Sequence, residues 1–280
     1  MPDSLRTFRV GNVEIGPGRP LGLIAGPCVL EEPDTVMRIA ESLVKLTQRL
    51  KIPYIFKASY EKDNRGSEKN YRGPGGEGLK LLRKVRETFG CPVLSDVHRG
   101  VDAQEAAEHL DVLQVPAYLC QQTELLLAIG KTGRGVNVKK GQFMAPEGMA
   151  GAVSKLKSVG NTNVLLTERG SSFGYNRLVS DLRAIPIMQA TGCPVVFDAT
   201  HIVRLYGVPS ADPRGGEPQY VPMLVRAGVA AGANALFLET HFNPAQAWCD
   251  AASMIPLKVL EPLMEQAMEF SALARRWNLA

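Results

Sequence analysis

The sequence lacks any long apolar run and any dense block of charge. None of its apolar stretches approaches the roughly 20 residues that cross a bilayer, and its N-terminal stretch, residues 1–16, shows no apolar core of a signal peptide. No block of five like charges appears, although the net charge is +4, so the basic residues do not form the patch typical of nucleic-acid binding. We therefore expect a cytoplasmic protein without membrane or nucleic-acid partners.

A disulfide framework is also missing. The five cysteines are odd in number and widely scattered, at positions 28, 91, 120, 193 and 249. This spacing favours thiols in a reducing compartment. No linker or low-complexity tract divides the chain either, so we expect one domain over residues 1–280, a length that α/β barrels commonly reach.

What the sequence does contain is a repeated alternation of apolar runs and amphipathic stretches. The eight runs rich in Val, Ile, Leu and Phe lie at 21–27, 54–60, 93–98, 112–119, 135–141, 163–170, 195–201 and 235–241. Segments between them, such as 35–50 and 76–90, repeat apolar residues at helical spacing. A strand followed by a helix, eight times over, predicts an α/β fold of the (β/α)8 TIM-barrel class. The alternative is a doubly wound open sheet.

Two segments outside this alternation have their own expected roles. Residues 8–16 alternate apolar residues around Gly-Asn, which predicts a β-hairpin that caps the bottom of the barrel. Segment 202–222 follows the seventh apolar run and is rich in Pro and Gly. We expect it to be an active-site loop, because barrels carry mobile loops at this position. A purely structural loop is equally compatible with its composition.

Polar residues collect where the apolar runs end. In a parallel barrel the C-terminal ends of all strands face one mouth, so these residues converge although they are far apart in sequence. They are Cys28, Lys57, Ser59, Asp96, His98, Gln114, Lys139, Lys140, Glu168, Arg169, Asp198, His201, Glu239 and His241. Because burying so many ionisable groups without partners would cost on the order of several kcal/mol each, we interpret this ring as functional.

One part of the ring has the donor types of a metal site. The first, seventh and eighth strands become neighbours when a barrel closes, which brings Cys28, His201 and Glu239 together, and Asp250 could fold back to join them. A thiolate, an imidazole and two carboxylates suit a divalent transition metal such as Fe, Zn or Mn. The alternative for Cys28 is a buried thiol that packs as a small hydrophobe.

A second part of the ring is basic. The second, fifth and sixth strands bring Lys57, Lys139 and Arg169 together, and Lys62 and Arg65 lie on the loop after the second strand. Clustered cations at a barrel mouth suit phosphate and carboxylate groups. We therefore expect phosphorylated, anionic substrates. The alternative is that some of these lysines pair with carboxylates of the same ring, Asp96, Glu168 or Asp198.

The segments around the predicted strand ends also resemble those of one enzyme family. In order along the chain they read FKASYEKDNRGS, YRGPGGEGL, VLSDVH, LQVPAYLCQQTELL, NVKKGQF, TERGSSFGYN, PVVFDATH and LFLETHFNP. Together they resemble the 3-deoxy-D-manno-octulosonate 8-phosphate synthases, a family similar to the 3-deoxy-D-arabino-heptulosonate 7-phosphate synthases. The resemblance implies a cytoplasmic, homotetrameric transferase. Such an enzyme performs an aldol-type condensation of phosphoenolpyruvate with D-arabinose 5-phosphate and water, releasing inorganic phosphate, on the route to the lipopolysaccharide sugar Kdo.

The resemblance further implies roles for individual residues. Phosphoenolpyruvate would be bound by Lys57, Ser59, Gln114, Lys139 and Arg169. Arabinose 5-phosphate would be bound by Lys62, Asn64, Arg65 and Ser67. The divalent metal would be held by Cys28, His201, Glu239 and Asp250, as in the metal-dependent branch of the family. The catalytic residues would be Lys57, Asp96, Lys139, His201 and Glu239. The metal-free branch carries Asn at the position of Cys28.

Two departures from the family pattern bear on these roles. Where the family usually reads Asn-Arg-Ser-Ser, this chain has Gly66 in place of the first Ser, so one hydroxyl expected near the sugar phosphate is missing. Ala251 follows Asp250 where Gly is common.

Two rival functions have their own signatures. A heptulosonate synthase that uses erythrose 4-phosphate would carry Lys-Pro-Arg-Thr-Ser on the second strand, which is absent here. A non-catalytic barrel that binds phosphorylated metabolites is disfavoured by the intact polar ring.

Overall fold

Eight parallel strands close into a barrel in this computed structural model, which describes residues 4–64, 66–173, 175–209 and 212–277. The strands pair in the order β11-β8-β7-β6-β5-β4-β3-β12, and β11 also pairs with β12. They are β3 (Gly22–Gly26), β4 (Tyr54–Lys57), β5 (Val93–Asp96), β6 (Val112–Val115), β7 (Gly135–Lys139), β8 (Val164–Glu168), β11 (Val195–Asp198) and β12 (Ala235–His241). The predicted (β/α)8 barrel is confirmed. The open-sheet alternative is wrong, because such a sheet would leave two edges unpaired.

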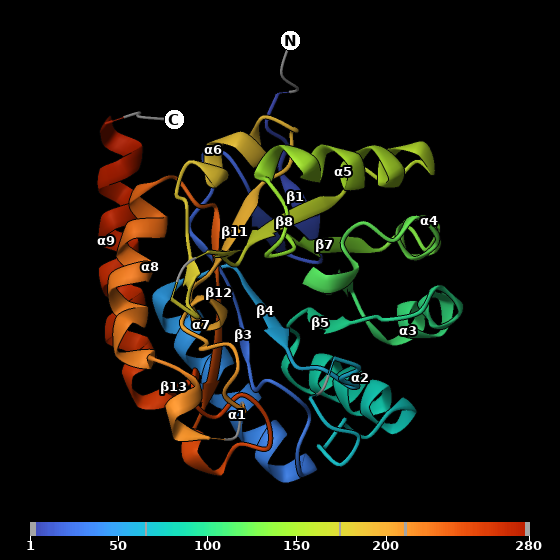
Figure 1. Cartoon of the computed structure of the whole chain (residues 1–280), viewed down its shortest axis with the longest axis vertical. Coiled ribbons are helices and arrows are strands. Elements are labelled where there is room, and N and C mark those ends of the chain that lie inside the picture. The colour runs from blue at the N-terminus through green and yellow to red at the C-terminus, as the bar shows by residue number, and fades with distance from the viewer. Residues whose placement is uncertain (1–3, 65, 174, 210–211, 278–280) are drawn as a thin grey trace.

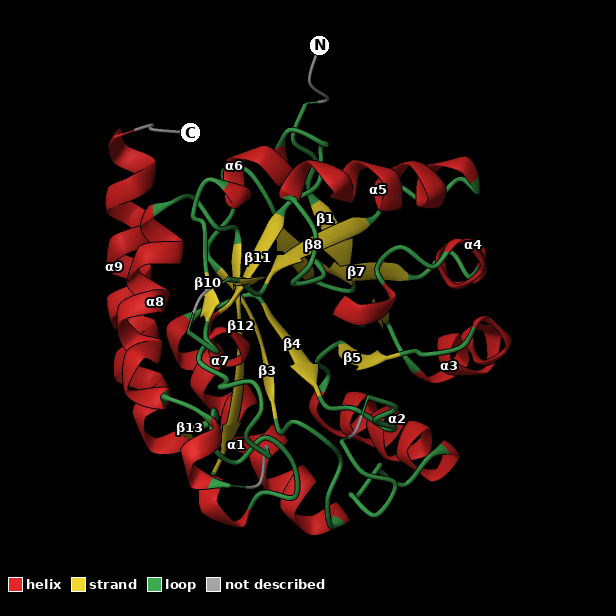
Figure 2. Cartoon of the chain, viewed as in Figure 1, coloured by secondary structure: helices red, strands yellow, loops and turns green. Residues whose placement is uncertain are grey.

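Helices surround the barrel, with α8 and α9 on one side and α3 and α4 on the opposite side of the view (Figure 1). They are α1 (Pro33–Leu50), α2 (Gly76–Phe89), α3 (Ala103–His109), α4 (Thr123–Lys131), α5 (Met149–Ser158), α6 (Ala184–Gln189), α8 (Val221–Ala230) and α9 (Leu260–Trp277). The short helix α7 (Ala199–Ile202) directly follows β11 at the C-terminal end of the barrel. Figure 2 shows the strands enclosed by these helices. None of the helices in the described part of the chain is both long enough and apolar enough to cross a membrane.

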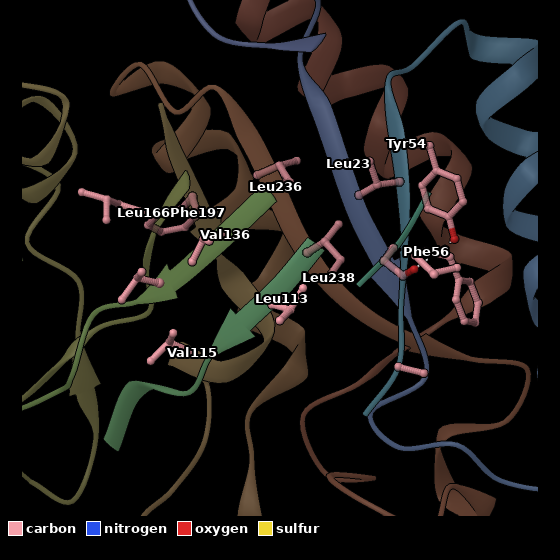
Figure 3. Close-up of a cluster of buried hydrophobic side chains, with 14 of the residues drawn as sticks. Leu23, Tyr54, Phe56, Leu113, Val115, Val136, Leu166, Phe197, Leu236 and Leu238 are labelled. Atoms are coloured by element: carbon pink, nitrogen blue, oxygen red, sulfur yellow. Dashed lines mark hydrogen bonds between the residues drawn. The ribbon is translucent and has the colours of Figure 1, made fainter. Parts of the chain in front are cut away.

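Side chains along the barrel strands alternate between two apolar layers. The outer layer packs between strands and helices, and Figure 3 shows Leu23, Tyr54 and Phe56 lying together on β3 and β4. The inner layer fills the barrel and consists of Ile24, Ile55, Leu94, Val112, Leu165, Val196, Ala235 and Phe237. Because both faces of the sheet are buried, its strands read as nearly continuous apolar runs.

A β-hairpin covers the N-terminal end of the barrel. Its strands β1 (Phe8–Val10) and β2 (Val13–Ile15) pair antiparallel. Phe8, Val13 and Ile15 join the inner layer, and the backbone N–H of Arg9 donates to Asn163 Oδ1 at 2.9 Å, just before β8. The structure therefore places the expected hairpin at the barrel bottom.

The opposite, C-terminal end carries the longer connections. A short pair, β9 (Ser171–Ser172) with β10 (Leu178–Val179), follows β8, and β13 (Ile255–Pro256) extends the end of β12. Segment 202–222 contains two 3-10 helices, Pro213–Gly215 and Pro218–Tyr220. Isolated bridges join Leu205 to Arg177 and Arg204 to Gly216. The segment therefore lies over the mouth, next to the connection after β8. Positions 210–211 are outside the described residues.

Candidate active site

A layer of polar side chains lies directly above the apolar inner layer, at the C-terminal ends of the strands. Each polar residue lies two positions after an inner-layer residue on the same strand. Side chains two positions apart on a strand point to the same side of the sheet. The apolar and polar partners are Ile55 and Lys57, Leu94 and Asp96, Val112 and Gln114, Val196 and Asp198, and Phe237 and Glu239. The alternation that points apolar side chains into the barrel therefore also points ionisable side chains into its mouth.

Two adjoining cavities open at this mouth, an inner one of about 50 Å³ and an outer one of about 510 Å³. Both are lined by Lys62, Asn64, Tyr118, Arg169 and His201. The inner cavity adds Lys57, Asp96, His98, Gln114 and Lys139. The outer cavity adds Ser67, Arg204, Tyr206 and Asp250. Most residues that the sequence indicated as substrate-binding thus line one continuous hollow.

The expected metal ligands gather on one side of this mouth. His201 Nε2 lies 3.7 Å from both Glu239 Oε2 and Asp250 Oδ2, and Cys28 Sγ lies 3.4 Å from Asp250 Oδ2. Glu239 Oε2 is buried and has no hydrogen-bond partner among the residues that the structure describes, as a ligand atom would. These sulfur, nitrogen and oxygen donors fit a divalent transition metal.

The glycine of the Gly-Pro that precedes Cys28 has a steric cause. A side chain at Gly26, the last residue of β3, would collide with the backbone carbonyl of Lys57 on β4. Beyond this close approach, the backbone N–H of Ser59 donates to the Cys28 carbonyl at 3.1 Å. The turn therefore fixes Cys28 against the end of β4 and next to the other donors.

A second sulfur joins this group. Cys249 Sγ lies 2.7 Å from Cys28 Sγ, and both residues are buried. Burial raises the pKa of the Cys28 thiol well above its ordinary value, and Cys249 and Asp250 add to this effect. The donors form two compact groups that share Asp250: one is His201, Glu239 and Asp250, and the other is Cys28, Cys249 and Asp250. Reasoning from the sequence missed Cys249, for which its adjacency to Asp250 was the available signal.

Asp198 connects the metal side of the mouth to the basic side. Its Oδ2 lies 2.8 Å from His201 Nδ1 and 2.7 Å from Lys139 Nζ. The contact to Nδ1 leaves Nε2 of the imidazole directed at Glu239 and Asp250, an arrangement typical of metal-ligating histidines. Burial lowers the pKa of His201 in spite of the Asp198 carboxylate, which favours the neutral imidazole. Burial alone would raise the pKa of Asp198, but His201 and Lys139 hold it far below its ordinary value.

Lys57 orients Glu239. Its Nζ donates to Glu239 Oε1 and to the Cys28 carbonyl, each at 2.8 Å. The side chains of Lys57 and Glu239 are each only 1% exposed. Burial alone would lower the pKa of Lys57, but the Glu239 carboxylate and the other acidic groups nearby, Asp96 and Cys28, together outweigh it and the pKa is raised. Lys57 is therefore a cation that holds one oxygen of Glu239 and leaves the other to face His201.

Asp96 is the centre of the basic side. It accepts hydrogen bonds from Ser59 Oγ and Gln114 Nε2, and Lys62 Nζ lies 3.5 Å from its Oδ2. Burial would raise the pKa of Asp96, but Lys62 and Lys57 hold it well below its ordinary value. The carboxylate is therefore ionised and fixes Lys62 and Ser59 at the inner cavity.

Two residues of segment 202–222 contact this site; the segment was expected to be an active-site loop, but neither residue was singled out from the sequence. Tyr206 Oη accepts from Arg169 Nη1 at 3.1 Å and from Gln142 Nε2 at 2.6 Å. Arg204 Nη1 donates to Asp250 Oδ1 at 2.9 Å. The segment thus reaches both the basic side and the metal side of the mouth.

Some residues of the expected ring have other partners. Lys140 Nζ lies 3.6 Å from Glu168 Oε2, and His241 Nε2 lies 3.3 Å from Glu31 Oε2. The expected ion pairs between lysines and ring carboxylates are present, but Lys62 and Lys139 line the cavity as well as pairing with Asp96 and Asp198. Arg65 lies outside the described residues.

Comparison with known proteins agrees with this geometry. A profile of the DAHP synthetase I family matches residues 4–275. The 2-dehydro-3-deoxyphosphooctonate aldolase of Citrifermentans bemidjiense is 50% identical over 272 residues, which cover 97% of this chain and 99% of the relative. The protein of the same name from Desulfosudis oleivorans is 52% identical over 260 residues, 92% of this chain and 93% of the relative. The chain belongs to the DAHP synthetase I family.

Proposed function

We infer that this protein condenses phosphoenolpyruvate with D-arabinose 5-phosphate and water to give 3-deoxy-D-manno-octulosonate 8-phosphate and inorganic phosphate. The relatives are named for this product, since 2-dehydro-3-deoxyphosphooctonate is another name for it. The protein is thus a transferase of Kdo biosynthesis. An eight-carbon product requires a five-carbon aldose as the partner of phosphoenolpyruvate, which disfavours erythrose 4-phosphate.

The observation that carries this function is the set of buried cations around the mouth. Lys57, Lys62, Lys139 and Arg169 are at most 8% exposed, and all of them line the inner cavity. Cations removed from water need anionic or strongly polar partners. Lys57, Lys62 and Lys139 already pair with carboxylates. Arg169 Nη1 donates to the neutral phenol of Tyr206, which orients the guanidinium, and its other N–H groups can bind a substrate carboxylate or phosphate.

The reaction joins two carbons and then releases phosphate. C3 of phosphoenolpyruvate attacks the aldehyde carbon of the sugar, and the aldehyde oxygen takes up a proton to become a hydroxyl. Water adds at C2, and the resulting phosphohemiketal breaks its C–O bond to phosphate. The contribution of the chain is electrostatic, because fixed cations hold both anionic substrates close together in reactive geometry.

The two cavities suggest where each substrate lies. We propose that Lys139 and Arg169 bind the phosphate and carboxylate region of phosphoenolpyruvate in the inner cavity, with Lys57, Ser59 and Gln114 beside them. Lys62, Asn64 and Ser67 of the outer cavity, together with Arg65, are proposed to bind the sugar phosphate. The ionised Asp96 has no proton to donate, so its role is to orient Lys62 and Ser59 beside the aldehyde.

A divalent transition metal, Fe, Zn or Mn, is proposed to be held by Cys28, His201, Glu239 and Asp250. When bound, such an ion acts as a Lewis acid that polarises the aldehyde or positions the water. The surrounding residues prepare the ligands: Asp198 contacts His201 Nδ1, and Lys57 contacts Glu239 Oε1.

Phosphate release tests this function. The assay compares arabinose 5-phosphate with erythrose 4-phosphate, before and after chelation that elemental analysis shows to be complete. We expect release with arabinose 5-phosphate, its loss after chelation, and its return with added divalent ions. Preference for erythrose 4-phosphate would indicate a heptulosonate synthase, and binding of phosphoenolpyruvate without release would indicate a non-catalytic barrel. Undiminished activity without metal would rule out a catalytic ion.

Assembly, location and the mobility of the mouth are further proposals. The family resemblance supports a cytoplasmic homotetramer, which sedimentation would test by a mass four times the 30.4 kDa of the chain. Segment 202–222 is proposed to act as an active-site loop, and the contacts of Arg204 and Tyr206 support this.

A further inference from the structure

The two carboxylate oxygens of Asp250 face different groups. Oδ1 accepts a hydrogen bond from Arg204 Nη1 at 2.9 Å. Oδ2 lies 3.4 Å from Cys28 Sγ and 3.7 Å from His201 Nε2. The side chains of Arg204 and Asp250 are only 16% and 15% exposed, so this ion pair is largely shielded from water.

Asp250 needs such a partner more than Glu239 and His201 do. It lies between β12 and β13, outside regular secondary structure, and its backbone has a φ of 49°. This left-handed conformation is uncommon for a residue with a side chain. Glu239, by contrast, lies within β12 and is held by Lys57, and His201 is held by Asp198.

We propose that Arg204 is a positioning residue for the metal site: by holding Asp250 Oδ1, it keeps Oδ2 directed at the ion. This inference rests on the metal ligands given under the proposed function. Charge supports it, because a thiolate and two carboxylates around a divalent ion leave one net negative charge in a buried place. Arg204 and Lys57 offset that charge from outside the ligand set.

The backbone of Arg204 is anchored independently of its side chain. It forms an antiparallel bridge with Gly216, and its N–H donates to the His201 carbonyl at 3.4 Å. Gly216 in turn packs so closely on Ala252 that an added side chain would collide with the Ala252 backbone. Replacing the Arg204 side chain should therefore leave the segment docked.

Metal affinity of the apoprotein tests the proposal. Wild type, Arg204→Gln, Arg204→Lys and Arg214→Gln are titrated with Zn²⁺ in competition with a chromophoric chelator. Arg214 is the matched control, because it lies in the same segment, is 86% exposed and pairs with Asp212. We expect Arg204→Gln to weaken Zn²⁺ binding by about 10- to 100-fold, the usual effect of losing a residue that orients a metal ligand. Arg204→Lys should recover most of this loss, and Arg214→Gln should bind as wild type does.

The visible absorption of bound Co²⁺ gives a second measurement, since it reports the arrangement of the ligands. We expect Arg204→Gln to change this spectrum and Arg214→Gln to preserve it. Wild-type affinity and spectrum in Arg204→Gln would overturn the role of Arg204 alone, and an equal loss in Arg214→Gln would overturn it too. Failure of the wild-type protein to bind stoichiometric metal would overturn both this inference and the proposed metal site.

Discussion

The two ends of the barrel are built from the same strands and have opposite chemical character. At the N-terminal end, the inner side chains are apolar and pack with Phe8, Val13 and Ile15 of the hairpin. Two residues further along the strands, the inner side chains are charged or polar and surround a cavity. A step of two residues on a strand therefore separates a layer that stabilises the fold from a layer that can bind and react.

The difference also shows how each end is stabilised. Apolar burial at the bottom is favourable without any special geometry. At the mouth, several buried charges pair with an opposite charge, as Lys57 does with Glu239 and Lys139 with Asp198. Such pairs contribute little net stability, but removing one partner leaves the other as a buried, uncompensated charge. Variants at the two ends should consequently fail in different ways.

The largest expected effect belongs to the apolar end. Phe8 is 1% exposed, and Phe8→Ala should lower the free energy of unfolding by about 3–5 kcal/mol, because it removes buried apolar volume and leaves a cavity. Denaturant unfolding measures this change. The KM values of the remaining folded enzyme should stay as in wild type. A change in substrate affinity without a change in stability would contradict the division between the two ends.

At the mouth, Arg169→Ala and Lys139→Ala should each lower turnover by on the order of a hundredfold or more, because each removes a fixed cation from the reacting anions. Steady-state phosphate release measures the effect. Arg169→Ala is the cleaner variant, since Lys139→Ala also leaves Asp198 without its partner in the ion pair. Wild-type turnover in both variants would disprove the assignment.

A smaller effect is expected from Tyr206→Phe, which removes the acceptor of the hydrogen bonds from Arg169 and Gln142. The loss of a hydrogen bond worth about 1 kcal/mol changes a binding constant by a factor of about five. The KM for phosphoenolpyruvate should therefore rise by roughly that factor. Tyr220→Phe, at an exposed position of the same segment, is the control. Equal KM values in the two variants would show that Tyr206 does not orient Arg169.

The smallest effect should come from Gly66→Ser. An added side chain at Gly66 meets open space, so the hydroxyl that family members carry there can be restored without a clash. We expect the KM for arabinose 5-phosphate to fall by up to about fivefold, the value of one hydrogen bond, with the KM for phosphoenolpyruvate unchanged. An unchanged KM for the sugar would mean that Ser67 or another group already supplies this contact.

Much of the fold could be predicted from the sequence, because strand pairing follows from a repeated pattern. The apolar runs predicted the eight strands, and barrel closure then made β3, β12 and β11 neighbours. Cys28, His201 and Glu239 therefore lie on one side of the mouth, with Asp250 close to both Cys28 and His201. The inclusion of Lys140 in the ring was wrong, because side chains alternate with a period of two along a strand. Lys140 follows Lys139 directly, so it faces the opposite side of the sheet and pairs with Glu168.

The remaining site residues lie on the segments that connect the strands and helices, so strand pairing does not determine their positions. Arg204, Tyr206 and Cys249 reach the mouth from segments without regular periodicity. Their positions follow from how those segments fold back over the barrel, as in the left-handed backbone at Asp250. A pattern of apolar and polar residues carries no information about such a path.

The most direct test of the account is a crystal structure with phosphoenolpyruvate bound. We predict that its phosphate and carboxylate oxygens lie in the inner cavity, within hydrogen-bond distance of Lys139 and Arg169. Phosphoenolpyruvate bound elsewhere, with no contact to either side chain, would contradict the claim that the polar layer of the barrel is the active site.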